Sequence, residues 1–194
     1  LGANWRSEIL CKIIPLLAEH HEFDQALAIL PEFKEDADLA EALCVLIPRL
    51  PDEAQATAFT ALKLIQSPAI CASALVNLAP FLPEHLHAKA LMLLKDFNDE
   101  EIRTQTLIGL TPNIPADLFS DLLAIICDLQ AKEYRSRALT AAVKRWLQLP
   151  VSHSLSLWKQ ATLSLSNRPR PDFLSDLQAL TPILSDLGGV SAIQ

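Results

Sequence analysis

The sequence predicts an all-α protein, an α-solenoid of about five antiparallel helix pairs with a period of 32–35 residues and a cap at its C-terminal end. Three observations predict this class. One segment recurs at nearly constant spacing, apolar residues follow helical periodicity within each copy, and only 4 of the 194 residues are glycine. So little glycine excludes Gly-looped nucleotide folds and turn-rich β-barrels. Hydrophobic residues make up 51% of the chain, which is enough for a continuous core.

A leucine-anchored helix recurs six times along the chain. The anchors are Leu10, Leu43, Leu75, Leu107, Leu139 and Leu177. Apolar residues follow the anchors at offsets +3 and +7, nearly without exception, which places them on one helical face. At offset +5, five of the six copies carry proline: Pro15, Pro48, Pro80, Pro112 and Pro182. The copy anchored at Leu139 carries Lys144 instead. Because proline removes an amide donor, this position is expected to end or kink the helix.

A second proline, at offset +8, marks the start of the next helix. Three copies carry it, as Pro51, Pro83 and Pro115, and acids follow it in two of them. Proline and carboxylates both favour a helix N-terminus. The sequence therefore predicts helices over 52–65, 84–97 and 116–129, and each repeat is expected to pair a longer helix with a shorter one that bears the anchor.

The repeats predict a single domain over residues 1–194. Residues 1–18 are expected to be the second helix of a first repeat, and residues 19–153 regular helix-pair repeats. Residues 154–194 depart from the spacing and contain the polar insert 167–171, so they are expected to form an atypical capping repeat and tail with a water-facing side. A closed helical bundle is the alternative that periodicity leaves open.

Charge and cysteine usage narrow the class of partner. The chain holds 16 basic and 23 acidic residues, a net charge of −7, so nucleic acid is not expected as a partner. No apolar stretch reaches the roughly 18 residues that cross a bilayer, and no secretory signal is present. Four cysteines stand far apart in apolar sequence and are expected to be buried and reduced: Cys11, Cys44, Cys71 and Cys127. These features predict a cytoplasmic protein that does not contact a membrane, and the start at Leu1 suggests a piece of a longer polypeptide.

No motif for catalysis, cofactor binding or metal binding is present. The chain lacks a Gly-rich phosphate loop, a His-Glu-x-x-His helix and a Gly-x-Ser-x-Gly turn. The histidines His20, His21, His85 and His87 lack the spacing of zinc ligands. We therefore expect no enzyme activity, no cofactor and no metal.

Three arginines share one register, four residues before the anchor: Arg6, Arg103 and Arg135. One interpretation is a ladder that binds a carboxylate or phosphate, and the other is a brace between each turn and its own helix. Recurrence at one register favours the brace.

A binding surface is expected where the register is constant and the residue type varies. Offsets −2, +2 and +6 lie on the face of the anchor helices opposite the core. The candidate residues are Glu41, Asn77, Phe81, Gln105, Asn113, Arg137 and Arg145. Offset −2 passes from acidic to basic along the chain. Residues 1–60 hold 11 acids and 4 bases, whereas residues 61–194 hold 12 of each. The alternative is a solvated face whose charge order is accidental.

The repeats resemble a known family. The Leu-x-Pro-x-Leu-Pro segment, the Ala/Leu-rich helix and acidic turns followed by arginine, at 99–103 and 132–135, resemble the C-terminal helical repeats of bacterial, especially cyanobacterial, STAND-type NTPases. The segment 170–189 also resembles the close of such arrays, while Leu39, Cys71 and Lys144 depart from the pattern. This resemblance implies a sensor region that follows an NB-ARC or NACHT module and keeps it off until a ligand binds.

The favoured hypothesis is a non-catalytic module that binds a protein partner or ligand on its inner surface and regulates an NTPase module in its parent chain. Two alternatives stay open. One is a catalytic helical-repeat domain of glycosylase-like or bilin-lyase-like type, and the other is a passive structural spacer.

Overall fold

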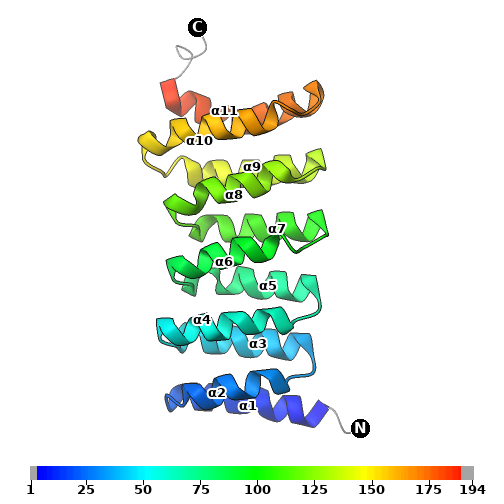
Figure 1. Cartoon of the computed structure of the whole chain (residues 1–194), viewed down its shortest axis with the longest axis vertical. Helices are drawn as coiled ribbons and strands as arrows, with labels where there is room; N and C mark the ends of the chain where they lie inside the picture. The colour runs from blue at the N-terminus through cyan, green and yellow to red at the C-terminus, as the bar shows by residue number, and fades with distance from the viewer. Residues whose placement is uncertain (1–3, 189–194) are drawn as a thin grey trace. The chain divides into compact units, whose positions relative to one another are not determined.

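The computed structural model describes residues 4–188 and, within them, the side chains of all residues except 4, 151 and 152. Regular structure in this range is entirely helical, with eleven α-helices and six short 3₁₀ turns (Figure 1). This result confirms the all-α class. Contacts within the chain divide it into two compact units, Leu1–Ala90 and Leu91–Gln194, and the boundary falls within one helix.

The first unit contains α1 to α5 and the start of α6. The bounds are α1 Asn4–Glu19, α2 Phe23–Ile29, α3 Asp36–Leu46, α4 Asp52–Thr60, α5 Pro68–Leu78 and α6 Glu84–Leu94. Successive helices run in opposite directions (Figure 1). The anchor helix α3 packs against α1 and α5, and α4 packs against α2. The unit therefore has two layers, one of anchor helices and one of their partners. Anchor helices are not the shorter members as expected, since α3 has 11 residues and α4 has 9.

The second unit contains the end of α6 and the last five α-helices. Their bounds are α7 Glu100–Leu110, α8 Phe119–Asp128, α9 Lys132–Trp146, α10 Val151–Leu165 and α11 Arg170–Gly188. Helix α9 packs against α7 and α11, and α8 packs against α10. The same two-layer arrangement therefore recurs in this unit.

In the three copies that carry two prolines, the second proline rather than the first decides where the anchor helix ends. Helices α1 and α11 continue through Pro15 and Pro182, which have no second proline three residues later. Helices α3, α5 and α7 instead change to a 3₁₀ turn and stop. The residue before the second proline is extended in each, as at Leu50 with φ −76° and ψ 146°. Proline disfavours helical geometry in the residue before it, which explains the stop.

A carboxylate at the start of one anchor helix ties it to the turn before the next. Asp36 Oδ2 accepts a hydrogen bond of 2.6 Å from the amide of Ser67. Glu100, in the same register, accepts bonds of 2.7 and 2.8 Å from the amides of Gln130 and Ala131. These amides lie just before helices, where donors lack helical partners. Each tie therefore caps one helix while joining it to the preceding repeat.

Two of the three recurring arginines, Arg103 and Arg135, brace the turn before their own helix. Arg103 donates to the carbonyl of Phe97, and Arg135 donates to the carbonyls of Leu129 and Gln130. Each carbonyl belongs to the turn before the arginine's own helix. In the described part of the chain Arg6 instead pairs at the surface with Glu32. The side chain of Arg135 is fully buried, which rules it out as part of a ladder that grips a ligand.

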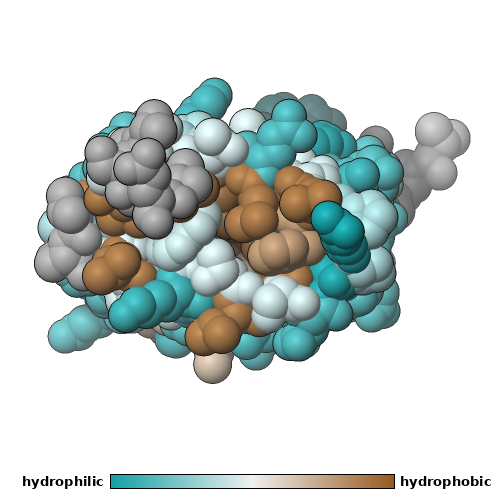
Figure 2. Space-filling view, turned by 90° about the horizontal axis from the view of Figure 1, so that it is seen from above, coloured by the Kyte–Doolittle hydropathy of each residue, from teal (hydrophilic) through white to brown (hydrophobic). Residues whose placement is uncertain are grey.

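The last pair differs from the regular repeats in register and surface. Leu180 is fully buried in α11, whereas Leu177, the expected anchor, is half-buried. The structural anchor therefore lies three residues later than predicted. The expected water-facing side is not purely polar, because Leu163 on α10 is 70% exposed and Leu174 on α11 is also exposed. Figure 2 looks onto this end of the second unit and shows apolar surface between the polar side chains.

Candidate binding groove

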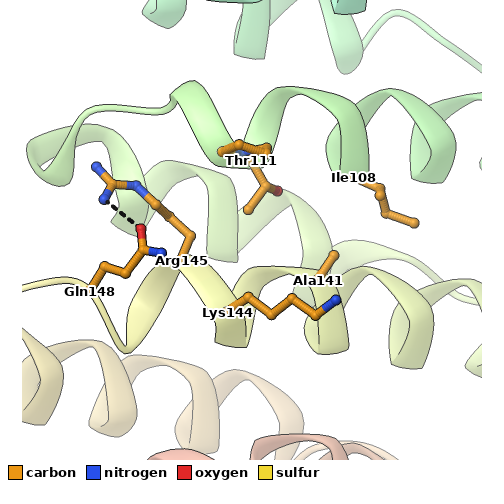
Figure 3. Close-up of a pocket in the computed structure, with 7 residues that line it drawn as sticks. Ile108, Thr111, Ala141, Lys144, Arg145 and Gln148 are labelled. Atoms are coloured by element: carbon orange, nitrogen blue, oxygen red, sulfur yellow. Dashed lines mark hydrogen bonds between the residues drawn. The ribbon is translucent and has the colours of Figure 1, made fainter.

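A groove runs between the anchor helices α7 and α9 of the second unit. Two adjoining cavities form it, with volumes of about 320 and 340 Å³. Both are lined by Ile108 of α7 and by Ala141 and Lys144 of α9, so they are continuous (Figure 3). The remaining lining residues are Thr111, Pro112, Ser136, Arg137, Thr140, Arg145 and Gln148.

The groove exists because α9 continues where the other regular anchor helices stop. Lys144 occupies the register of the repeated proline, and α9 runs on to Trp146 without a 3₁₀ turn. The extra turn brings Lys144 and Arg145 onto the groove. Trp146 is fully buried on the opposite side, where its ring meets that of Phe119 edge-on at a centroid distance of 6.0 Å.

The lining is cationic. It contains Arg137, Lys144 and Arg145 and no Asp or Glu. Arg145 is held in place, because it donates to the carbonyl of Ile114 and to Gln148 Oε1, each at 3.3 Å (Figure 3). Within the described part of the chain, Arg137 and Lys144 make no ion pair or side-chain hydrogen bond, and both are exposed. These two charges are therefore free to meet a ligand.

Acidic groups lie beyond one end of the groove. Glu101 on α7 accepts a hydrogen bond from Gln105 Nε2 at 3.3 Å. Its negative charge raises the pKa of the half-exposed Tyr134 phenol, and Arg137 opposes this shift. The positive region therefore begins near Arg137 and extends toward the C-terminal end of α9.

The structure brings four of the seven predicted site residues to this region. Arg137 and Arg145 line the groove, Gln105 is exposed on α7, and Asn113 is half-exposed in the 3₁₀ turn after α7. The other three, Glu41, Asn77 and Phe81, are exposed in the first unit, with Phe81 at 53%. They are not part of the α7–α9 groove. Their role as a binding surface stays a prediction.

Of the ten lining residues, the sequence predicts only Arg137 and Arg145 as site residues. Lys144 and Ile108, which line both cavities, are the most important of those it misses: Lys144 is an exception to the proline register, and Ile108 follows the buried anchor Leu107. The signal for Lys144 was present, because loss of proline in a basic segment predicts a longer helix that carries its charges further.

A second cavity, of about 360 Å³, lies on the other side of α7. It is lined by Lys95, Arg103, Ala124, Ile125 and Asp128. Arg103 is already bound to a backbone carbonyl, and both signs of charge are present. This cavity therefore has a weaker preference for any charged ligand than the groove.

Histidines and cysteines do not form a reactive or metal-binding site in residues 4–188. No group of three or more His, Cys, Asp or Glu residues with suitable geometry occurs there. Cys71 and Cys127 are buried, and burial raises the pKa of each thiol to about 11. Cys11 and Cys44 are only half-buried, contrary to expectation, and burial also raises their pKa values. Raised pKa values disfavour the nucleophilic thiolate.

Comparisons with protein-family models, curated proteins and solved structures find no match to this chain. The resemblance to STAND-type NTPase repeats therefore stays a prediction from sequence. None of the described helices is long and apolar enough to span a membrane.

Proposed function

We propose that this protein is a non-catalytic helical-repeat module that binds an acidic segment of a protein partner in the groove between α7 and α9. The observation that carries the proposal is the lining itself, which holds three cationic residues and no acid although the chain has a net charge of −7. Electrostatic complementarity of this kind selects partners and speeds their association. The lining also lacks His, Cys and carboxylates, the usual groups of acid–base and nucleophilic catalysis.

The dimensions and lining of the groove suit a short extended peptide. It follows α9 from Ser136 to Gln148, which corresponds to about 18 Å at 1.5 Å per residue. A strand of five or six residues has this length. Ile108 and Ala141 offer apolar contact, while the hydroxyl-bearing side chains of Ser136 and Thr140 line the wall formed by α9. The preferred ligand is therefore an acidic segment with an apolar residue among its acids.

Selection from a displayed library of random 12-residue peptides tests this proposal. The wild-type protein serves as bait, and an Arg137→Glu/Lys144→Glu variant serves as counter-bait. Selected peptides should be rich in Asp and Glu and should bind the variant at least tenfold more weakly, a loss of about 1.4 kcal/mol. Lys159→Glu on α10, outside the groove, is the matched control and should bind normally. Peptides without acidic bias, or equal binding to the double variant, would refute the proposal.

We further propose that the helix pairs form one α-solenoid of about five pairs. The support is the recurrence within each unit of the same joint, in which anchor helices pack together and a carboxylate caps the next helix. A compact globule of 194 residues has a radius of gyration of about 16 Å. Small-angle scattering should give a clearly larger value, and about 16 Å would contradict the solenoid.

The regulatory role implied by the family resemblance is part of the same proposal. The module would act as a sensor, and ligand binding would shift the equilibrium of an NTPase module in a longer parent chain. The encoding gene tests this idea directly. A Gly-x-x-x-x-Gly-Lys-Ser/Thr motif upstream of residue 1 is the expected finding, and an unrelated upstream domain would remove the assignment.

A further inference from the structure

Each anchor helix has two apolar faces that contact neighbouring anchor helices. Offsets −3 and +4 from the anchor form the face toward the following helix, here called the forward face. The forward-face residues covered within one unit are Ser7, Ile14, Ala40, Ile47, Thr104, Thr111, Ser136 and Val143, and all are buried except the half-buried Ser136. Offsets −1 and +3 form the backward face, toward the preceding helix. Its covered residues are Ala42, Leu46, Ala74, Leu78, Ala138, Ala142, Ala179 and Ile183, and all are buried except the half-buried Ala179.

The backward face of α1 is exposed. Ile9, at offset −1, is 45% exposed, whereas Ala42 at the same offset of α3 is 3% exposed. Trp5 and Leu16 are exposed on the same side of α1, and Ile13 is half-exposed. Residues 5, 9, 13 and 16 follow one helical stripe. The forward face of this helix is buried as usual, so exposure is confined to the side that anchor helices normally present to a predecessor.

The forward face of α11 is exposed in a complementary way. Leu177 and Leu184 stand at offsets −3 and +4 from the structural anchor Leu180, and both are half-exposed. Leu174, on the margin of this face, is exposed. Ile183 on the backward face is buried, consistent with packing against α9. The apolar surface in Figure 2 belongs to this end of the second unit.

We propose that these two faces are the two halves of one joint, and that a second copy of this chain docks its α1 against the α11 of the first. The joint is one that the chain already builds between α1 and α3, α3 and α5, α7 and α9, and α9 and α11. A second copy carries the required backward face in the required register. The contact is heterologous, since different surfaces meet, and it leaves one free face at each end. This association does not involve the α7–α9 groove and is independent of the function proposed above.

Analytical ultracentrifugation of the whole chain tests the proposal. The sedimentation coefficient of the wild type should rise with concentration from about 10 μM to 1 mM, and it should rise past the dimer because the free faces allow growth. Ile9→Glu blocks the α1 face, and Leu177→Glu blocks the α11 face. Each variant alone should remain monomeric. An equimolar mixture should form dimers and nothing larger, because only one competent face of each kind is present.

Control variants separate this joint from unfolding and from other modes of association. Lys12→Glu on α1 and Ser185→Glu on α11 change exposed residues and should associate like the wild type. Circular dichroism verifies that each variant is folded, and Leu174→Glu replaces Leu177→Glu if the half-buried site does not tolerate charge. A monomeric wild type up to 1 mM, self-association of Ile9→Glu alone, or a monomeric mixture would overturn the proposal.

Discussion

The ion pair between Arg135 on α9 and Asp176 on α11 gives the sharpest test of how the last joint is held. Arg135 Nε lies 2.7 Å from Asp176 Oδ2, and both side chains are fully buried. Asp172 is 3.8 Å from the same guanidinium but is partly exposed. Burial, with a smaller contribution from the charge of Asp172, raises the pKa of Asp176, and the hydrogen bond and charge of Arg135 oppose that shift. The pair therefore stabilises the joint only while both partners are present.

Asp176→Ala should destabilise the protein by about 3–5 kcal/mol, the usual cost of removing one partner from a buried pair. Without Asp176, the Arg135 guanidinium is left as a buried charge without its closest partner, which is the source of this cost. A loss of that size is a large part of the 5–15 kcal/mol that typically holds a domain folded. Residual pairing of Arg135 with Asp172 places the expected value near the lower limit.

The double variant Arg135→Met/Asp176→Leu should be less destabilised than Asp176→Ala. Apolar replacement of a buried pair is neutral or stabilises by about 1–4 kcal/mol. Against this gain, the carbonyls of Leu129 and Gln130 lose Arg135 as a donor. The loss should stay below the about 1–3 kcal/mol of an unsatisfied buried group, because Leu129 keeps a hydrogen bond from Arg168 at 3.2 Å and Gln130 is exposed. Urea denaturation followed by circular dichroism gives the free energies of unfolding. The single variants Arg135→Met and Asp176→Leu complete the cycle. If their losses of unfolding free energy add up to the loss in the double variant, the pair is not coupled and the reasoning fails.

Three further predictions concern protonation, backbone strain and thiol reactivity. In Arg135→Met the pKa of Asp176 should rise further, so the folded state holds the proton more tightly than the unfolded state does. The stability of this variant, measured as the urea midpoint, should therefore increase as the pH falls from 8 to 5. A flat profile would contradict this. His21→Gly should raise the stability by about 1 kcal/mol in thermal denaturation, because His21 has φ 59° after the end of α1, in the left-handed region that favours glycine. A lower stability would show that the ring contact of His21 with Phe23 outweighs this strain. Iodoacetamide at pH 8 should modify Cys71 and Cys127 more slowly than the two half-buried cysteines, as read by mass spectrometry, and equal rates would contradict the burial.

The regular repeats were predictable because their signals are local. Leucines at a period near 32 residues identified the buried faces, and the anchors Leu43, Leu75, Leu107 and Leu139 are all fully buried. The second prolines correctly marked helix starts, since local backbone geometry depends on neighbouring residues. The first proline was expected to end or kink the helix, and in α1 and α11 it does not end it, because both helices continue through it.

The register of α11 was not predictable from periodicity. Leu177 and Leu180 are both leucines at acceptable spacing, so the pattern alone does not select the anchor. The choice follows from Asp176, which is buried because Arg135 meets it from α9. An aspartate normally lies on the surface, so the sequence alone does not predict that Asp176 is buried. Its burial follows from its partner Arg135, 41 residues earlier in the chain.

The sequence by itself determined the helices, their pairing period and the positions that each helix buries, because these depend on backbone chemistry and hydrophobic spacing within one repeat. Only the tertiary structure decided which charges are free and which faces are covered. Arg135 and Arg137 are two residues apart on one helix, yet the first is buried in a joint and the second is exposed on the groove. The physical reason is that burial depends on neighbouring helices, and the two anchor helices that pack against α9, namely α7 and α11, lie more than twenty residues away on either side.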